Sequence, residues 1–154
     1  MTAKKHLIRG YYRIVKKNYV VVIADDGKDI IFVKEYRHGI MKDHINLPMG
    51  FIEPGETPLH AAKREIMEEC GITAKKSMYL GKFYLVPSLI NSRGHIVFMQ
   101  GISIDTKQKK EDPGEEVELI KIAKAKIRAY VKKGTLNDAS TQLALYTAIE
   151  RGLV

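Results

Sequence analysis

The segment from residue 50 to residue 72, GFIEPGETPLHAAKREIMEECGI, constrains the fold of this chain more than any other stretch. Thr57 followed by Pro58 is typical of a helix N-terminus. A glycine such as Gly71 is typical of the residue that ends a helix by adopting the left-handed backbone conformation. We therefore expect a helix from about Pro58 to Cys70. At roughly 100° per residue, four apolar residues share one side of this helix and should pack on a sheet. They are Leu59, Ala62, Ile66 and Cys70.

Three carboxylates, those of Glu65, Glu68 and Glu69, lie on the neighbouring side of the predicted helix. Ala61 projects between them with little bulk, so we expect a space there in which ions could sit. Without a counter-ion such groups repel, which raises their pKa values and destabilises an exposed helix by a few tenths of a kcal/mol per pair. Carboxylates combined with water and phosphate oxygens are typical ligands of Mg²⁺. The cluster thus favours a Mg²⁺ site, with Mn²⁺ as the alternative ion and a plain acidic helix face as the competing interpretation.

Strand-like and helical patterns alternate along the rest of the chain. Residues 11–24 and 30–37 are rich in Val, Ile and Tyr and flank the turn pair Asp26-Gly27, which predicts a hairpin whose apolar runs are covered on both faces. Residues 39–47 lack this pattern and predict a loop. Further elements are expected in this order: strands at 78–86 and 95–104, a short strand at 117–122, and helices at 124–133 and 138–151. This order predicts an α/β (α+β) sandwich, with a mixed β-sheet between helices, formed by a single domain of 154 residues.

Composition limits the partners and the compartment. The net charge of +8 is compatible with nucleic-acid binding. However, aromatic residues are not interleaved with the basic ones as on RNA-binding surfaces, so we expect a solvated surface or one that steers small anions, and no nucleic-acid partner. No apolar run approaches the roughly 18 to 20 residues that cross a bilayer, and the start of the chain lacks the apolar core of a signal peptide. With Cys70 as its only cysteine, the chain is expected to be cytoplasmic, with no membrane partner.

The residues around the carboxylates resemble the signature of the Nudix hydrolase family. That signature is Gly, five residues, Glu, seven residues, Arg-Glu, an aliphatic residue, any residue, Glu-Glu, any residue, Gly and an aliphatic residue. Every position is matched, by Gly50, Glu56, Arg64, Glu65, Ile66, Glu68, Glu69, Gly71 and Ile72. Seven of these positions require one amino acid, so agreement by chance is very improbable. The resemblance implies a Nudix sandwich and hydrolysis of a nucleoside diphosphate linked to another group.

The same resemblance implies roles for individual residues. The implied metal ligands are Glu65 and Glu69, Glu68 as a further ligand or water holder, and the backbone carbonyl of Met49. Arg64 and Glu56 would orient these ligands, because a guanidinium can hold a carboxylate through two parallel hydrogen bonds. A structural salt bridge between Arg64 and Glu56 is the alternative interpretation, and the two are compatible.

Similarity to the ADP-ribose pyrophosphatase branch of the family extends beyond the signature. It includes the run FVKEYRHGIMKDHINLPMG at 32–50 and Pro87, which lies fifteen residues past Ile72, where that branch carries a proline. By this resemblance Arg37 would contact substrate phosphate and Pro87 would mark the substrate site. The alternatives are an arginine facing solvent at a strand end and a proline that only stiffens its loop.

The general base implied by the resemblance lies in a late acidic loop that closes over the substrate. The candidates are Glu111, Glu115 and Glu116, of which we favour Glu115. In this branch a glutamate usually precedes Leu-Pro, whereas this chain has Asn46 there. That departure favours nucleoside diphosphate sugars as a class over ADP-ribose alone.

The expected reaction is metal-dependent hydrolysis of a nucleoside diphosphate sugar, with ADP-ribose giving AMP and ribose 5-phosphate as the leading case. The competing substrates are GDP-mannose, dinucleoside polyphosphates and capped RNA. A non-catalytic nucleotide- or RNA-binding module is the competing kind of function. Because relatives in this branch are often dimers whose sites borrow residues from the partner, a homodimer is expected.

Overall fold

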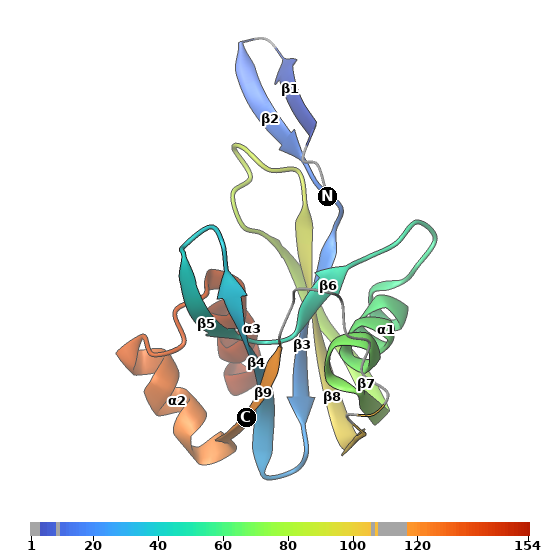
Figure 1. Cartoon of the computed structure of the whole chain (residues 1–154), viewed down its shortest axis with the longest axis vertical. Coiled ribbons are helices and arrows are strands. Elements are labelled where there is room, and N and C mark those ends of the chain that lie inside the picture. The colour runs from blue at the N-terminus through green and yellow to red at the C-terminus, as the bar shows by residue number, and fades with distance from the viewer. Residues whose placement is uncertain (1–3, 9, 106, 108–116) are drawn as a thin grey trace.

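A seven-stranded β-sheet forms the centre of the molecule (Figure 1). The computed structural model describes residues 4–8, 10–105, 107 and 117–154, with side chains from residue 10 onward. The strands of the sheet are β3 Tyr19–Asp25, β4 Asp29–Arg37, β5 Lys42–Asn46, β6 Met49–Phe51, β7 Ile72–Tyr84, β8 Arg93–Ile104 and β9 Glu118–Ala123. Their order is β5-β4-β3-β8-β7, with β6 paired to β3 and β9 paired to β4. Because β3 and β8 are parallel and the other pairs are antiparallel, the sheet is mixed, as the sequence predicts.

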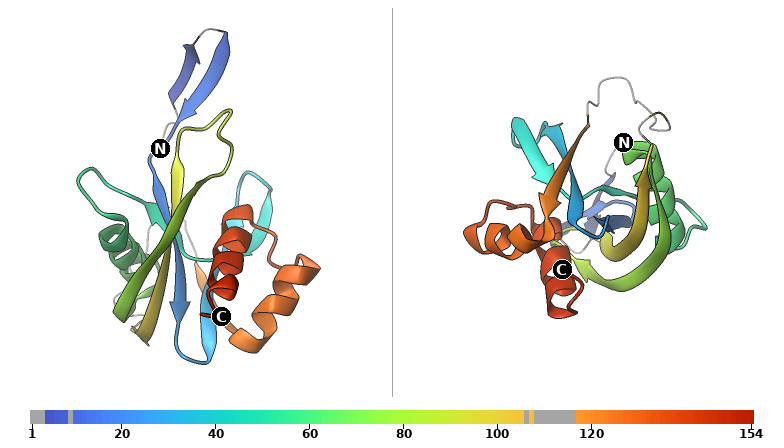
Figure 2. Two further views of the ribbon diagram at one scale, coloured as in Figure 1. Left: turned by 180° about the vertical axis from the view of Figure 1, so that it is seen from behind. Right: turned by 90° about the horizontal axis from the view of Figure 1, so that it is seen from below.

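Helices cover both faces of this sheet, as two views of the molecule show (Figure 2). Helix α1, Pro58–Cys70, packs on one side, and α2, Lys124–Lys133, with α3, Ala139–Glu150, packs on the other. The α/β/α sandwich and its α+β class are therefore confirmed. No helix in the described part of the chain is long and apolar enough to cross a membrane.

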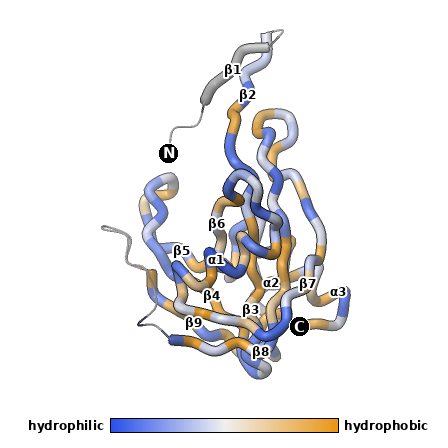
Figure 3. Tube along the Cα trace, turned by 90° about the vertical axis from the view of Figure 1, so that its right-hand side faces the viewer, coloured by the Kyte–Doolittle hydropathy of each residue, from blue (hydrophilic) through white to orange (hydrophobic). Residues whose placement is uncertain are grey.

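Strand β3 supplies side chains to both cores. Val20, Val22 and Ala24 are buried with α1, whereas Val21 and Ile23 are buried with α2 and α3. All five are fully buried, as expected when successive side chains of a strand covered by helices on both faces point in opposite directions. Apolar residues are concentrated in the strands of this sheet (Figure 3). The position of β3 thus fixes β6 beside it, and β6 carries the start of the signature.

Helix α1 begins and ends where its capping residues predict. The Thr57 hydroxyl oxygen accepts a hydrogen bond from the backbone N–H of His60 at 3.3 Å, and Gly71 ends the helix with φ 64°. Ala61 is fully buried in the core under α1, so the prediction that it leaves a space for ions between the carboxylates is wrong. The apolar side of α1 is wider than expected, because Ala61 packs beside the predicted residues. The buried residues are Ala61, Ala62, Ile66 and Cys70, with Leu59 partly buried.

The strand predicted at residues 11–24 is two strands in the structure. Residues 11–24 are divided by the polar residues 16–18 into β3 and a separate strand, β2 Tyr11–Val15. Strand β2 pairs with β1, Lys4–Ile8, in a two-stranded ribbon that projects from the body (Figure 1). The backbone N–H of Lys16 donates to the Asn91 side chain at 3.0 Å, which ties the base of this ribbon to the loop between β7 and β8.

The predicted loop at residues 39–47 contains strand β5 instead. Lys42–Asn46 pairs with β4 along five residue pairs, from Arg37 opposite Lys42 to Val33 opposite Asn46. The local pattern does not reveal this hairpin, since only the last residue of β5 is buried. Strand β7 begins at Ile72 and not at residue 78 as predicted, because its pairing with β8 extends to Ile104.

Candidate active site

The Arg64 guanidinium lies at the centre of the acidic cluster. Its Nε and Nη2 donate to the two carboxylate oxygens of Glu56 at 2.8 and 2.9 Å, and Nη1 donates to Glu65 at 2.8 Å and Glu68 at 3.1 Å. Nη2 also donates to the backbone carbonyl of Phe51 at 2.8 Å. The salt bridge that the sequence suggested between Arg64 and Glu56 is therefore present, and it extends to two predicted metal ligands. These contacts also join α1 to β6 and to the loop between them.

Glu65 packs directly against the backbone of Gly50 in β6. A Cβ atom at residue 50 would lie 1.9 Å from Cδ and 2.2 Å from Oε2 of Glu65, so a larger residue would displace this carboxylate. The Glu65 side chain is only 14% exposed. Burial raises the pKa of Glu65, the hydrogen bond from Arg64 partly opposes this, and Glu68 and Glu56 add to the rise. The signature glycine thus holds open the place in which this carboxylate lies.

The cluster carries more negative than positive charge. Glu56, Glu65 and Glu68 together contribute three negative charges to the single positive charge of Arg64, which leaves an excess of two. Glu69 lies one helical turn beyond Glu65, on α1, and is half-buried. Hard carboxylate oxygens with excess negative charge suit a divalent cation, so the residues fit such an ion by their chemistry.

In the conformation observed, the carboxylates predicted as metal ligands are not arranged around one position. No group of three His, Cys, Asp or Glu side chains within the described ranges could hold a metal ion as placed. Glu65 and Glu68 are instead hydrogen-bonded to the Arg64 guanidinium. Ion binding would therefore require the carboxylates to turn from Arg64 or to share their oxygens with it.

A cleft of about 260 Å³ opens beside the cluster. It is lined by Met49 and Gly50 of β6 and by Arg37 at the end of β4. Since Gly50 also contacts Glu65, the cleft joins the predicted phosphate-binding arginine to the strand that supports the acidic cluster. Arg37 ends a strand, as the alternative interpretation requires, but it lines the cleft as well.

Sequence reasoning missed several residues of this cleft. The Tyr19 hydroxyl lies 3.0 Å from the Ser140 hydroxyl, and both residues line the cleft together with Lys16 and Ser92. Burial raises the pKa of Tyr19, which keeps its hydroxyl protonated, and the hydrogen bond with Ser140 opposes part of this rise. These residues come from separate stretches of the chain, and no local motif connects them.

Two predicted site residues do not join this group. Pro87 lines a separate cavity of about 480 Å³ with Tyr11 and Tyr12, beside the projecting ribbon. The favoured general base, Glu115, lies outside the described residues, as do Glu111 and Glu116. The structure therefore places Gly50 of the signature and Met49 in one cleft with Arg37, and it places Pro87 elsewhere.

An acidic helix of this pattern, packed on β6 in an α/β/α sandwich, defines a Nudix-type hydrolase domain. The profile of the NUDIX domain matches residues 16–138. The chain belongs to the Nudix family.

Within that family, the chain is similar to proteins named as hydrolases of ADP-ribose and of ADP compounds. It is 31% identical to an ADP-ribose pyrophosphatase of Bacillus subtilis, over 82% of this chain and 68% of that protein. It is 28% identical to an ADP compounds hydrolase of Escherichia coli, over 85% of this chain and 68% of that protein. A crystal structure of an ADP compounds hydrolase superposes with a TM-score of 0.83 at 25% identity, covering 94% of this chain and 80% of that one. The chain is thus a pyrophosphohydrolase similar to the ADP-ribose pyrophosphatases, and hydrolases of this family generally use divalent metal ions.

Replacement of Gly50 tests the contact with Glu65. Gly50→Ala is expected to lower the free energy of unfolding by about 1–3 kcal/mol, because the added methyl group overlaps the Glu65 carboxyl. In a Glu65→Ala background the overlap is absent, so the same substitution should cost clearly less. Urea denaturation of the four proteins measures both costs, and equal costs in the two backgrounds would contradict the contact.

The pKa of Glu56 gives a second test. Hydrogen bonds from Arg64 and from the backbone N–H of Glu53 lower this pKa from 4.5 to about 2. A carboxyl whose pKa is lowered by folding stabilises the fold above pH 4.5, and this contribution is lost as the pH falls toward 2. The melting temperature of the wild type should therefore drop more than that of Glu56→Gln between about pH 6 and about pH 2.5. Parallel melting curves for the two proteins would show that Glu56 has no such role.

Proposed function

We propose that this chain hydrolyses the diphosphate linkage of a nucleoside diphosphate sugar, with ADP-ribose, cleaved to AMP and ribose 5-phosphate, as the leading substrate. The observation that carries this proposal is the position of Gly50, which contacts Glu65 and lines the same cleft as Arg37. Through Gly50, the acidic cluster lies beside an opening that is lined by a guanidinium suited to phosphate. The relatives named ADP-ribose pyrophosphatase and ADP-sugar pyrophosphatase, from Bacillus subtilis and Mus musculus, support the choice of substrate.

The proposed metal ion is Mg²⁺, with Mn²⁺ as the alternative. Its proposed ligands are Glu65, Glu69, Glu68 and the backbone carbonyl of Met49. When bound, a divalent ion neutralises charge on the phosphate oxygens and lowers the pKa of a coordinated water. The excess of negative charge around Arg64 supports this assignment, because the guanidinium alone does not balance the carboxylates.

The residues of the chain itself have positioning roles in this proposal. Glu56 fixes Arg64 through two hydrogen bonds, and Arg64 in turn restrains Glu65 and Glu68. Such a chain of contacts limits how far a ligand carboxylate can turn, which keeps the cost of ordering it at ion binding small. Arg37 receives substrate phosphate, and Glu115 accepts a proton from the attacking water.

We also propose that the chain acts as a single catalytic domain in a cytoplasmic homodimer, with no nucleic-acid partner. The projecting ribbon supports the dimer, since Tyr11 is 77% exposed and Tyr12 is 54% exposed. Leu85, Val86 and Leu89 in the adjacent loop are exposed as well, so apolar side chains gather at this end. Sedimentation at the enzyme concentration of the assay should show a dimer, and a monomer there would refute this part of the proposal.

Substitution of Glu69 tests the proposed ligand set. Glu69→Gln is expected to lower kcat about 100-fold or more at saturating Mg²⁺, because a neutral amide is a poor ligand for this ion, while the melting temperature stays close to that of the wild type. Glu150→Gln, which changes an exposed glutamate at the end of α3, is the matched control and should keep full turnover. Near-normal hydrolysis by Glu69→Gln would remove Glu69 from the site.

Product analysis decides the substrate. The wild type is incubated with ADP-ribose, GDP-mannose, a dinucleoside polyphosphate and capped RNA at equal concentrations, and the products are separated by chromatography. The expected result is the highest kcat/KM on ADP-ribose, with AMP and ribose 5-phosphate as products. A higher kcat/KM on another of these compounds would replace ADP-ribose, and no turnover of any of them would refute the proposed reaction.

A further inference from the structure

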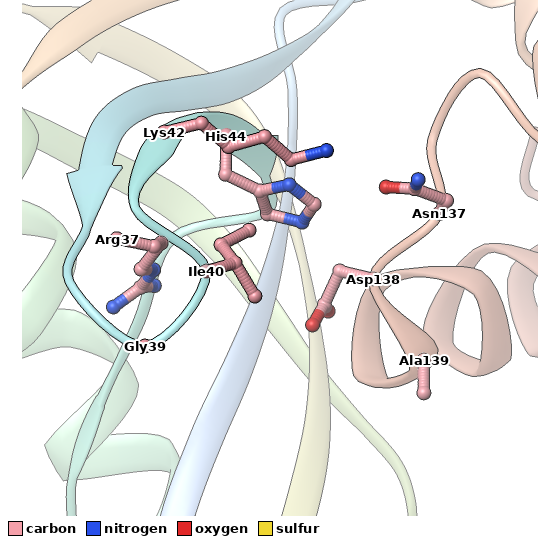
Figure 4. Close-up of a pocket in the computed structure, with 8 residues that line it drawn as sticks. All are labelled: Arg37, Gly39, Ile40, Lys42, His44, Asn137, Asp138 and Ala139. Atoms are coloured by element: carbon pink, nitrogen blue, oxygen red, sulfur yellow. The ribbon is translucent and has the colours of Figure 1, made fainter.

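A second cavity, of about 720 Å³, lies next to the active-site cleft. One wall is the β4–β5 hairpin, with Arg37, Lys42 and His44, and the other is the start of α3, with Asp138 (Figure 4). The two cavities share Arg37, and consecutive residues of α3 line them, Ala139 in the second cavity and Ser140 in the cleft. Arg37 thus lies at the junction of the two cavities.

Arg37 is held at this junction by neighbouring side chains. Its Nη2 lies 2.5 Å from Oε1 of Glu35, and the Nδ2 of Asn46 donates to the same Glu35 oxygen at 3.3 Å. Asn46 is buried, and its Nδ2 also donates to the backbone carbonyl of Leu47 at 2.9 Å. The guanidinium thus extends from a fixed base, which lowers the entropy cost of binding a phosphate between the two cavities.

The sizes of the two cavities fit a ligand with two lobes. The cleft, at about 260 Å³, is smaller than the roughly 300–1,000 Å³ typical of sites that enclose a small molecule. A nucleoside diphosphate sugar has two bulky halves joined by a narrow diphosphate. With its diphosphate at Arg37, one half would occupy the cleft and the other half the second cavity.

The charges around the second cavity favour an anion. Arg37 and Lys42 both line it, and within the described ranges Lys42 makes no ion pair. Asp138 is the acidic side chain among the lining residues, and its Oδ1 accepts a hydrogen bond from the backbone N–H of Thr141 at 2.7 Å, so this carboxylate caps α3. The N-terminal end of α3 adds a partial positive charge.

The nearby carboxylates of the hairpin are already paired. Glu35 contacts Arg37, and Asp43 lies 3.4 Å from the Lys34 ammonium. The Lys42 ammonium is therefore the cation on this wall that is left to meet a bound group. His44 projects into the same space and can contact that group through its ring nitrogens (Figure 4).

We propose that the second cavity binds the half of the substrate beyond the diphosphate, and that it favours a half bearing a further phosphate group. This inference rests on the proposed function, because it places the scissile diphosphate at Arg37. The chemical class is thus a nucleoside diphosphate linked to a phosphorylated sugar. Lys42 is the specificity-determining residue, with Arg37 shared between the two phosphate-bearing parts.

A matched pair of substrates tests the proposal. The values of kcat/KM are measured for ADP-ribose and for ADP-ribose 2″-phosphate, which differ by one phosphate group. The wild type should prefer the phosphorylated compound, and the ratio of the two values should fall about fivefold in Lys42→Gln, as expected for the loss of one partly exposed ion pair. Lys132→Gln, which removes an exposed lysine on α2, is the control and should leave the ratio at the wild-type value.

Two results would overturn the proposal: a wild type without preference for the phosphorylated compound, or a ratio unchanged in Lys42→Gln. Equilibrium binding of the same two compounds, measured by calorimetry, separates this inference from the proposed reaction. If the wild type cleaves neither compound, the proposed reaction fails. Tighter binding of the phosphorylated compound that weakens in Lys42→Gln would still support the cavity assignment, and equal dissociation constants would refute it.

Discussion

The contacts of the Arg64 guanidinium are the interaction on which the candidate site depends. One side chain joins Glu56 in the loop before α1, the Phe51 carbonyl in β6, and Glu65 and Glu68 in α1. Without it, the carboxylates would repel one another at short range, and the loop would lose its main tie to the helix. The same guanidinium balances only part of their charge, so the arrangement that holds the helix to β6 also leaves the excess negative charge on which the proposed cation site rests.

The scaffold places this arrangement beside the cleft by burying both faces of the sheet. Strand β3 supplies residues to both cores, and its edge toward β6 is paired at Tyr19, Val20 and Val21. Helix α1 is fixed by its buried side, which packs on β3, and β6 contacts α1 while pairing with β3. Because Gly50 in β6 leaves room for Glu65, the close packing of strand and helix positions this carboxylate of the site as well as burying the core.

The features of the structure that depend on residues close together in the sequence could be predicted from it. The cap at Thr57 and the left-handed residue Gly71 bounded α1 correctly, and the salt bridge between Arg64 and Glu56 was expected from the signature. Strand β5 forms a hairpin with the neighbouring β4, but it was missed because only its last residue is buried and it has no apolar alternation. The Tyr19–Ser140 contact joins two segments far apart in the sequence, so no short pattern encodes it. The burial of Ala61 was missed because helical periodicity gives a side chain's direction but not the depth at which the helix packs.

We propose that the negative charge left unbalanced around Arg64 makes this cluster a divalent-cation site. It is tested most directly by the melting temperature of the protein during titration with MgCl₂, against NaCl at matched ionic strength. Mg²⁺ is expected to raise the melting temperature above the NaCl control, because an ion that binds only the folded state stabilises it, and Glu69→Gln is expected to remove most of this rise. Equal melting temperatures in the two salts would contradict it.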